Sequence, residues 1–381
     1  MRTVRPTYAA ALLGLGPFCS AVGAAGPSTA PAPAYTPLRW NEDYRYLRDP
    51  VRHTDLFDPI KYIPLNEDGD WYLSLGGQAR YRYEWFESAS FGIGPQDDNG
   101  FHLLRLMGHV DAHFGRNVRA FVQGTAAQAT GREGGERPVI DENAFDFHQA
   151  FFDLNVPIDN DVSLLLRGGR QNLLYGAQRL ISPLDWTNTR RTFDGGRASL
   201  KWHEDLTVDF FYVHPIVVDK GPLDNSNGNV VFTGFYNMLM LPDILEGAES
   251  RVEAYGLYLD NDTANFAASG VGDENRYTIG GRFYTNPKPW DADVEAAYQF
   301  GDFAGDDISA WMFATEGGYT FAGRPHTPRA FLGFDIASGD RDATDGALNT
   351  FNQLFPLGHA YLGYIDVIGR QNIIDLHPGV S

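Results

Sequence analysis

The stretch DWYLSLGGQARYRYEWFE, residues 70–87, decides the fold class. Its odd-numbered positions from Trp71 to Trp85 carry apolar or small side chains, and its even-numbered positions from Ser74 to Glu84 carry polar or charged side chains or glycine. This alternation over about 16 residues predicts a β-strand of about 50 Å, whereas the mean soluble strand has about 5–6 residues. Aromatic residues at both ends of the apolar face are typical of a transmembrane β-barrel. A long strand of a β-sandwich is the alternative.

The same alternation recurs along the chain. Further strands are expected at 104–114, 117–128, 144–156, 161–171, 191–203, 206–212, 251–260, 275–285, 291–303, 308–321 and 328–338. Short turns are expected near 115–117, 157–160, 203–205, 286–289 and 322–328, and long polar or glycine-rich loops at 88–100, 129–143, 172–190, 220–248, 261–273 and 339–360. Short turns at one end and long loops at the other indicate an outer-membrane barrel.

The strand count is expected to be about 12 by residue 338, with a thirteenth strand near Gly369, although single-chain bacterial barrels have even numbers. The chain ends without an apolar terminal strand. The sequence therefore predicts an all-β, transmembrane antiparallel β-barrel over residues 70–381, C-terminally incomplete, with strands missing.

The first 69 residues precede the predicted barrel. Arg2 and Arg5, an apolar stretch at 9–15 and the small residues 23–25 predict a secretory signal peptide over residues 1–25. Residues 26–69 are expected to form an extended periplasmic N-terminal segment, inserted in the lumen or packed on its rim. Cys19, the only cysteine, lies in the signal peptide, so the mature chain would hold no disulfide. No apolar run reaches the roughly 18 residues of a membrane helix.

A basic cluster stands out because the chain carries 30 Lys and Arg against 49 Asp and Glu, a net charge of −19. That acidity argues against nucleic acid as a partner. Between Arg167 and Lys201, by contrast, seven side chains are basic. If polar faces point into the lumen, they can bind and pass anions. The predicted pore-lining residues are Arg80, Arg82, Arg105, Arg167, Arg170, Arg179, Asp185, Arg190, Arg191, Asp194, Arg197 and Lys201.

Two points about this set stay open in the sequence. Arginine and carboxylate groups can pair across strands and stiffen the wall without meeting a solute. Strict alternation also places Arg170 on the face opposite Arg167, unless Gly168 and Gly169 host a β-bulge.

The sequence offers little catalytic or metal-binding chemistry, so no enzyme activity and no cofactor is expected. His109 and His113 share a strand face but would lie about 13 Å apart, too far to bind one metal ion. Asp340, Asp342 and Asp345 are an alternative Ca²⁺ site in a loop, although a solvated acidic loop is the favoured interpretation.

Residues 169–195, GRQNLLYGAQRLISPLDWTNTRRTFDG, resemble a signature of the alginate export family of AlgE-like outer-membrane porins. Residues 338–366 and the tail RQNIIDL at 370–376 resemble its later signature. The resemblance covers roughly residues 40–376. It implies an 18-stranded monomeric barrel with an arginine-rich electropositive constriction that exports an acidic polysaccharide.

The expected function is passive export of an alginate-like anionic polysaccharide through an arginine-lined lumen in the outer membrane of a Gram-negative cell. The alternatives are a general or anion-selective porin for small organic solutes, and a non-conducting surface barrel. Expected partners are an anionic polysaccharide or small anions, outer-membrane lipid and periplasmic export components, with the protein a monomer.

Overall fold

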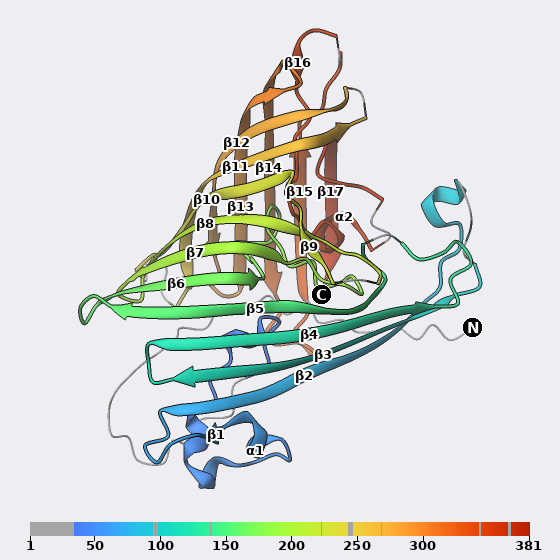
Figure 1. Ribbon diagram of the computed structural model, residues 1–381. Helices are drawn as coiled ribbons and strands as arrows, with labels where there is room; N and C mark the ends of the chain where they lie inside the picture. Colours follow the sequence, from blue (N-terminus) through green and yellow to red (C-terminus); the bar gives the residue numbers. More distant parts are fainter. Residues whose placement is uncertain are drawn as a thin grey trace.

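The computed structural model describes residues 34–93, 96, 98–137, 139–221, 223–242, 247–267, 269–342, 344–364 and 367–381. It consists mainly of one sheet of long strands (Figure 1). The long strands are β2 (Trp71–Glu84), β3 (Phe101–Phe114), β4 (Val118–Thr130), β5 (Asn143–Pro157), β6 (Val162–Gln171), β7 (Phe193–Trp202), β8 (Leu206–Val217), β10 (Val230–Met240), β11 (Ser250–Phe266), β12 (Gly270–Thr285), β13 (Trp290–Phe303), β14 (Asp306–Thr320), β15 (Arg329–Ala337) and β17 (Ile373–Val380). The predicted signal peptide lies outside the described residues.

The remaining elements are short. They are the strands β1 (Ile63–Pro64), β9 (Asn225–Ser226) and β16 (Ala347–Leu348), the helices α1 (Asp58–Lys61) and α2 (His359–Leu362), and the 3-10 helices η1 (Arg39–Asn41), η2 (Arg45–Arg48), η3 (Pro50–Arg52) and η4 (Ala89–Gly92). In the part of the chain that the structure describes, no helix combines the length and the apolar character needed to cross a membrane.

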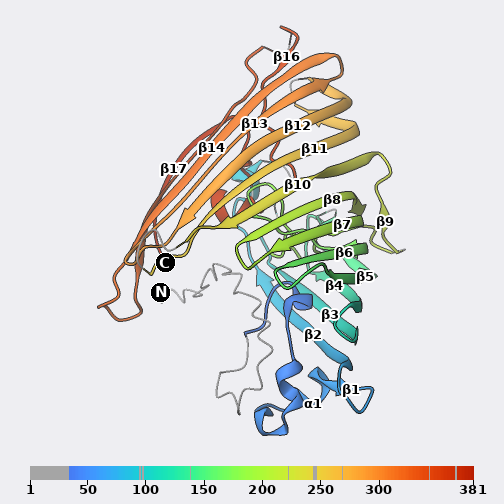
Figure 2. The same ribbon diagram turned by 90° about the vertical axis from the view of Figure 1, so that its left-hand side faces the viewer.

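The long strands pair antiparallel in chain order from β2 to β8, then through β10 to β15, and finally to β17. The sheet is strongly curved, with β2 at one margin and β17 at the other (Figures 1 and 2). We call the space on its concave side the hollow. Within the described residues, no ladder with a defined register joins β17 to β2. The structure thus confirms the all-β, antiparallel barrel class.

The expected number of strands, about 12 to 13, is wrong by one long strand. Seventeen strands are present among the described residues, of which three have two residues each, so that fourteen are long. The additional strand is β10, which lies inside the expected loop 220–248. Its inward residues, such as Phe232 and Tyr236, are as apolar as its outward Phe235 and Leu239, so the period-two pattern is missing.

A second correction concerns the expected loop 261–273. β11 and β12 extend through it as a hairpin, with a register shift between Asn261 and Ala264. With β10 in place, the connections alternate regularly between two ends of the sheet. We call these the short-turn end, with turns such as 203–205, and the loop end, with connections such as 172–192 and 338–372.

The outer face of the sheet is apolar, as a surface facing lipid requires. Large exposed side chains include Leu106, Val110, Ile279 and Leu332. Exposed aromatic side chains lie toward both ends of the strands: Trp71, Trp202 and Trp290 toward the short-turn end, and Tyr83, Tyr212, Tyr298 and Trp311 toward the loop end. The two aromatic bands predicted from residues 70–87 therefore continue around the sheet.

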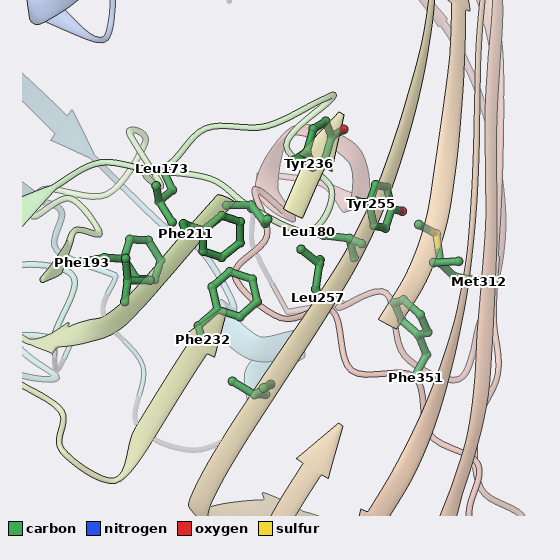
Figure 3. Packing of buried hydrophobic residues seen from close by; sticks show 14 of the residues in the cluster. Leu173, Leu180, Phe193, Phe211, Phe232, Tyr236, Tyr255, Leu257, Met312 and Phe351 are labelled. Atoms are coloured by element: carbon green, nitrogen blue, oxygen red, sulfur yellow. The ribbon is translucent and has the colours of Figure 1, made fainter. Parts of the chain in front are cut away.

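Two loops fold into the hollow and bury an apolar cluster against the inner face. Phe193, Phe211, Phe232 and Leu257 come from the strands, Leu173 and Leu180 from loop 172–192, and Phe351 from loop 338–372 (Figure 3). Ile181 and Phe355 join the two loops in a parallel bridge. The Leu180 carbonyl accepts a hydrogen bond from the Phe355 amide at 2.9 Å. Part of the inner face is therefore an apolar core covered by loops.

Candidate functional site

Loop 172–192 runs from one side of the inner wall to the other. Arg179 Nη1 donates to Asp293 Oδ1 at 2.8 Å and to Glu295 Oε2 at 3.0 Å, both on β13. Six residues later, Asp185 Oδ1 accepts a hydrogen bond of 2.8 Å from Arg105 on β3. Since β13 and β3 lie far apart in the order of the sheet, the loop crosses the hollow.

Arginines gather where this loop meets β2 and β3. Arg80 donates to the carbonyl oxygens of Asp185, at 2.7 Å, and Thr187. Arg105 is fully buried and also bonds to both of these carbonyls, at 3.1 and 3.2 Å. Arg190 Nε lies 3.1 Å from the Asp185 carboxylate. Two guanidinium groups therefore contact the Asp185 carboxylate, and a third binds the backbone beside it.

Ion pairs on the neighbouring chain extend this group. Arg82 pairs with Glu84 at 2.5 Å. Arg137 lies 3.7 Å from Glu84 and 2.7 Å from Asp141, which Arg132 approaches at 3.6 Å. We call the whole set the Asp185 arginine cluster; it comprises Arg80, Arg82, Arg105, Arg132, Arg137 and Arg190 with Glu84, Asp141 and Asp185. Six cations share three carboxylates, so the cluster is positively charged inside an acidic protein.

The pKa of the Asp185 carboxyl group reflects this positive charge. Burial alone would raise the pKa of its carboxyl group, but Arg190, Arg105 and Arg80 hold that pKa below its ordinary value. The carboxylate therefore stays ionised at neutral pH. Some buried guanidinium donors near it have no hydrogen-bond acceptor, including Arg80 Nε, Arg105 Nε and Arg190 Nη2. Such donors favour an added acceptor, because an unpaired buried polar group is costly.

The other predicted arginines are mostly held by partners in the wall. Arg167 donates to both oxygens of Asp153 at 2.7 Å. Arg197 Nε lies 3.1 Å from Asp209. Arg191 Nη1 donates to the carbonyls of Ser182 and Pro356 at 3.2 and 3.3 Å. Lys201 lies exposed near the short-turn end of β7. At Arg167 and Arg197 the sequence alternative of cross-strand pairing describes the geometry.

Arg170 and Asp194 form a separate pair. Arg170 Nε donates to Asp194 Oδ1 at 2.8 Å, and its Nη1 donates to Asp146 Oδ2 at 2.8 Å. The ladders of β6 pass Gly168 and Gly169 without a register shift, so the bulge considered from the sequence is absent there. In the alternation of β6, Arg170 falls on the side of Gly168, opposite Arg167. The structure therefore keeps this pair apart from the Asp185 arginine cluster.

Sequence reasoning missed several members of the site. Arg132, Arg137 and Asp141 lie in an expected loop and show no periodic pattern. Asn188 is fully buried and donates to the carbonyls of Leu104, at 3.2 Å, and Gln128, at 3.0 Å. It thereby pins loop 172–192 to β3 and β4. The sequence signal was the density of polar residues in 182–192, which a solvated loop would show equally.

Metal-ligand geometry is confined to one place among the described residues. Donor atoms of Asp335, Asp375 and His377 lie within 4.8 Å of one another. Arg370 already pairs with Asp335 at 3.2 Å, which lowers the attraction for a cation. In the acidic loop, Asp340 and Asp342 instead accept backbone hydrogen bonds from Asp342 and Thr344.

Comparison with known protein families shows to which family the chain belongs. The model of the alginate export family matches residues 71–381, which is most of the chain and the whole described sheet. The chain belongs to the alginate export family. Together with the long antiparallel strands and their apolar outer face, this membership makes the protein an outer-membrane β-barrel porin, in a transport family and not an enzyme family. A search of the curated proteins gives no match.

Several solved structures match the chain at low sequence identity. OccAB1 of Acinetobacter baumannii is 9% identical, with a TM-score of 0.44, 74% of this chain and 84% of that chain being covered. Pseudomonas aeruginosa OccK2 (OpdF), solved in complex with glucuronate, is 13% identical, with a TM-score of 0.40 and the same two coverages. OpdO of Pseudomonas aeruginosa is 9% identical, with a TM-score of 0.40, 72% of this chain and 82% of that chain being covered.

In this member of the alginate export family, the signature seen in residues 169–195 builds the inserted loop. Gly169 and Gly195 lie opposite each other in the ladder of β6 and β7 and frame the loop. Arg179 and Asp185 contact the two walls, at β13 and β3, and Arg190 pairs with Asp185 inside the loop. The signature is thus a structural unit that places charged groups across the hollow.

Proposed function

We propose that this protein exports an anionic, alginate-like polysaccharide by passive diffusion, with the solute carboxylates passing the Asp185 arginine cluster. The observation that supports this most is the ratio of six arginines to three carboxylates at the point where loop 172–192 meets β2 and β3. A guanidinium group presents a planar pair of donors that matches a carboxylate. A polyuronate carries one carboxylate on each sugar, so it can move from one arginine to the next.

The balance of charges in the cluster also suits transport better than tight binding. An excess of positive charge raises the local concentration of anions. Glu84, Asp141 and Asp185 compete with the solute for the same guanidinium groups, which keeps each contact weak. Conduction requires sites that bind well enough to admit the solute and weakly enough to release it.

Delivery to the membrane follows from the sequence. We propose that residues 1–25 act as a secretory signal peptide and that the apolar outer face of the sheet contacts outer-membrane lipid. In this proposal the protein works as a monomer that receives its solute from periplasmic export components.

Block of single-channel current by uronate oligomers tests the proposal. We expect mannuronate oligomers added to a planar bilayer to interrupt the current, and neutral oligosaccharides of equal length to have little effect. Arg80→Gln and Arg190→Gln should weaken the block by about tenfold together, since each removes one charged contact. Arg341→Gln is the matched control, because Arg341 lies exposed in loop 338–372. Equal block by charged and neutral oligomers would reject the proposal.

A porin for small organic anions is the second candidate. It is favoured by the apolar cluster that loops 172–192 and 338–372 build against the inner wall, which narrows the space for a polymer. In that case, monomeric uronates and other small carboxylates carry current through the channel. Uronate oligomers neither block this current nor pass through the channel. A protein that inserts but carries no current at all would be a non-conducting surface barrel.

A further inference from the structure

Part of the N-terminal segment, residues 34–62, lies on the concave side of the sheet (Figure 2). Its Trp40 contacts the wall at Arg167. The guanidinium carbon of Arg167 lies 3.9 Å from the centroid of the Trp40 ring, and that of Arg197 lies 5.9 Å away. The Trp40 carbonyl accepts a hydrogen bond of 2.6 Å from Arg119 Nη2. The Trp40 ring also meets Phe151 edge to face, at 6.2 Å between centroids.

The depth of this contact places Trp40 in the interior and not on the rim. Arg167 follows Val162, the first residue of β6 at the short-turn end, by five positions. At about 3.3 Å per residue, this is about 16 Å into the sheet. Arg197 lies equally far from Trp202, the last residue of β7 at the same end. The segment therefore enters from the short-turn end and reaches the middle of the strands.

Trp40 covers a part of the wall in which three arginines pair with three carboxylates. Arg119, Arg167 and Arg197 come from β4, β6 and β7, and all three direct their guanidinium groups at Trp40. Their carboxylate partners, such as Asp153 for Arg167, lie in the wall behind them. The aromatic ring and carbonyl of Trp40 thus stand where a solute would otherwise meet these cations.

The two ends of the segment are held differently. Near its C-terminal end, Lys61 bonds to Asp55 and Asp58, at 2.5 and 2.9 Å, and Tyr62 packs on Tyr72 of β2 at 4.9 Å between centroids. By contrast, Trp40 Nε1 is buried and meets no hydrogen-bond acceptor among the described residues. Such a donor lowers the net stability of docking. The bonds of Lys61 therefore stiffen the base internally, and Tyr62 with the pairing of Ile63 and Pro64 on β2 attaches it to the sheet. The docking of the tip is not optimised, because the Trp40 donor is unsatisfied.

We propose that residues 34–62 form an autoinhibitory plug, in which Trp40 covers the Arg119, Arg167 and Arg197 wall and conduction requires the tip to swing out around the base at Asp58–Tyr62. The plug acts on any solute, so it does not depend on the solute being a polyuronate. The short-turn end is the periplasmic end of an outer-membrane barrel. The plug therefore responds to changes on the periplasmic side, from which an exported solute arrives.

Single-channel conductance of Trp40→Ala in planar bilayers tests the plug. We expect the mean conductance or the open fraction to rise at least about twofold, because a covered constriction is uncovered. Trp202→Ala is the matched control, since Trp202 is exposed on the outer face of β7. It should leave both quantities unchanged.

A second variant guards against a folding defect in Trp40→Ala. Asp58→Asn weakens the base, because Asp58 accepts bonds from Lys61 and from the amides of Thr54 and Asp55 and touches none of the three arginines of the wall. Like Trp40→Ala, Asp58→Asn should raise the conductance. Wild-type conductance in both variants would overturn the plug. If the two variants raise the conductance but the channel shows no anion selectivity, the plug is supported and the anion role is rejected. If the conductance is unchanged but the channel is anion-selective, the anion role is supported and the plug is rejected.

Discussion

The Arg105 guanidinium lies 2.8 Å from the Asp185 carboxylate and joins β3 to a loop 80 residues further along the chain. Arg105 is fully buried, whereas the Asp185 side chain is 44% exposed. The pair fixes loop 172–192 across the hollow and leaves part of the Asp185 side chain exposed. Asp185 is therefore both a structural contact and the main counter-charge of the cluster.

Asp185→Asn should change selectivity and stability together. It removes the carboxylate that Arg105 and Arg190 share, so anion selectivity should increase. The free energy of unfolding should fall by about 1–3 kcal/mol, because buried guanidinium groups lose their counter-ion. Reversal potentials and urea unfolding in lipid vesicles measure the two effects. Asp345→Asn, in an exposed loop, makes the same charge change, and equal effects from both variants would contradict this role of Asp185.

Gly169→Ala should be strongly destabilising, and Gly168→Ala should not. Gly169 has a φ of +127°, and an added Cβ would come within 2.3 Å of the Ala150 carbonyl oxygen. A Cβ on Gly168 meets no atom within 4 Å. We expect a loss of at least about 2 kcal/mol for Gly169→Ala and a change within about 1 kcal/mol for Gly168→Ala. Equal stability of Gly169→Ala and Gly168→Ala in urea titration would contradict this role of Gly169 in framing loop 172–192.

Acid should loosen the contact between the two inserted loops at His359. Its ring stacks on Trp186, with centroids 4.3 Å apart. Burial, with Arg82 and Arg137 nearby, lowers the pKa of His359 from 6.5 to about 4. Since this pKa is depressed in the folded state, the contribution to stability is complete above about pH 6.5 and is lost as the pH falls toward 4.

Tryptophan fluorescence and channel noise between pH 7 and pH 4 should report that loosening. His359→Phe keeps an aromatic ring on Trp186 but cannot take up a proton. It should therefore flatten the pH profile in this range. A profile identical to that of the wild type would assign the transition to another group.

The strands were largely predictable because each has one face toward lipid. Residues 71–85 show the alternation most clearly, since the inward side carries Ser74, Gln78 and Arg80. β10 broke the rule because its inner face packs on the inserted loops and is as apolar as its outer face. The sequence pattern records polarity, and the two sides of β10 do not differ in polarity.

The site was only partly predictable, because it depends on contacts that no local pattern encodes. The basic residues of 167–201 were found, but their division between the Asp185 arginine cluster, wall pairs and the Arg170–Asp194 pair depends on where the loop crosses. The contact of Trp40 with Arg167 could not be predicted either, because the segment around Trp40 shows no periodic pattern.

The reversal potential of the channel under a KCl gradient tests the central claim most directly. We expect anion selectivity in the wild type, reduced in Arg80→Gln/Arg190→Gln and preserved in Arg341→Gln. A cation-selective wild type, or a selectivity that the two cluster substitutions leave unchanged, would contradict the role of the Asp185 arginine cluster in passing anions.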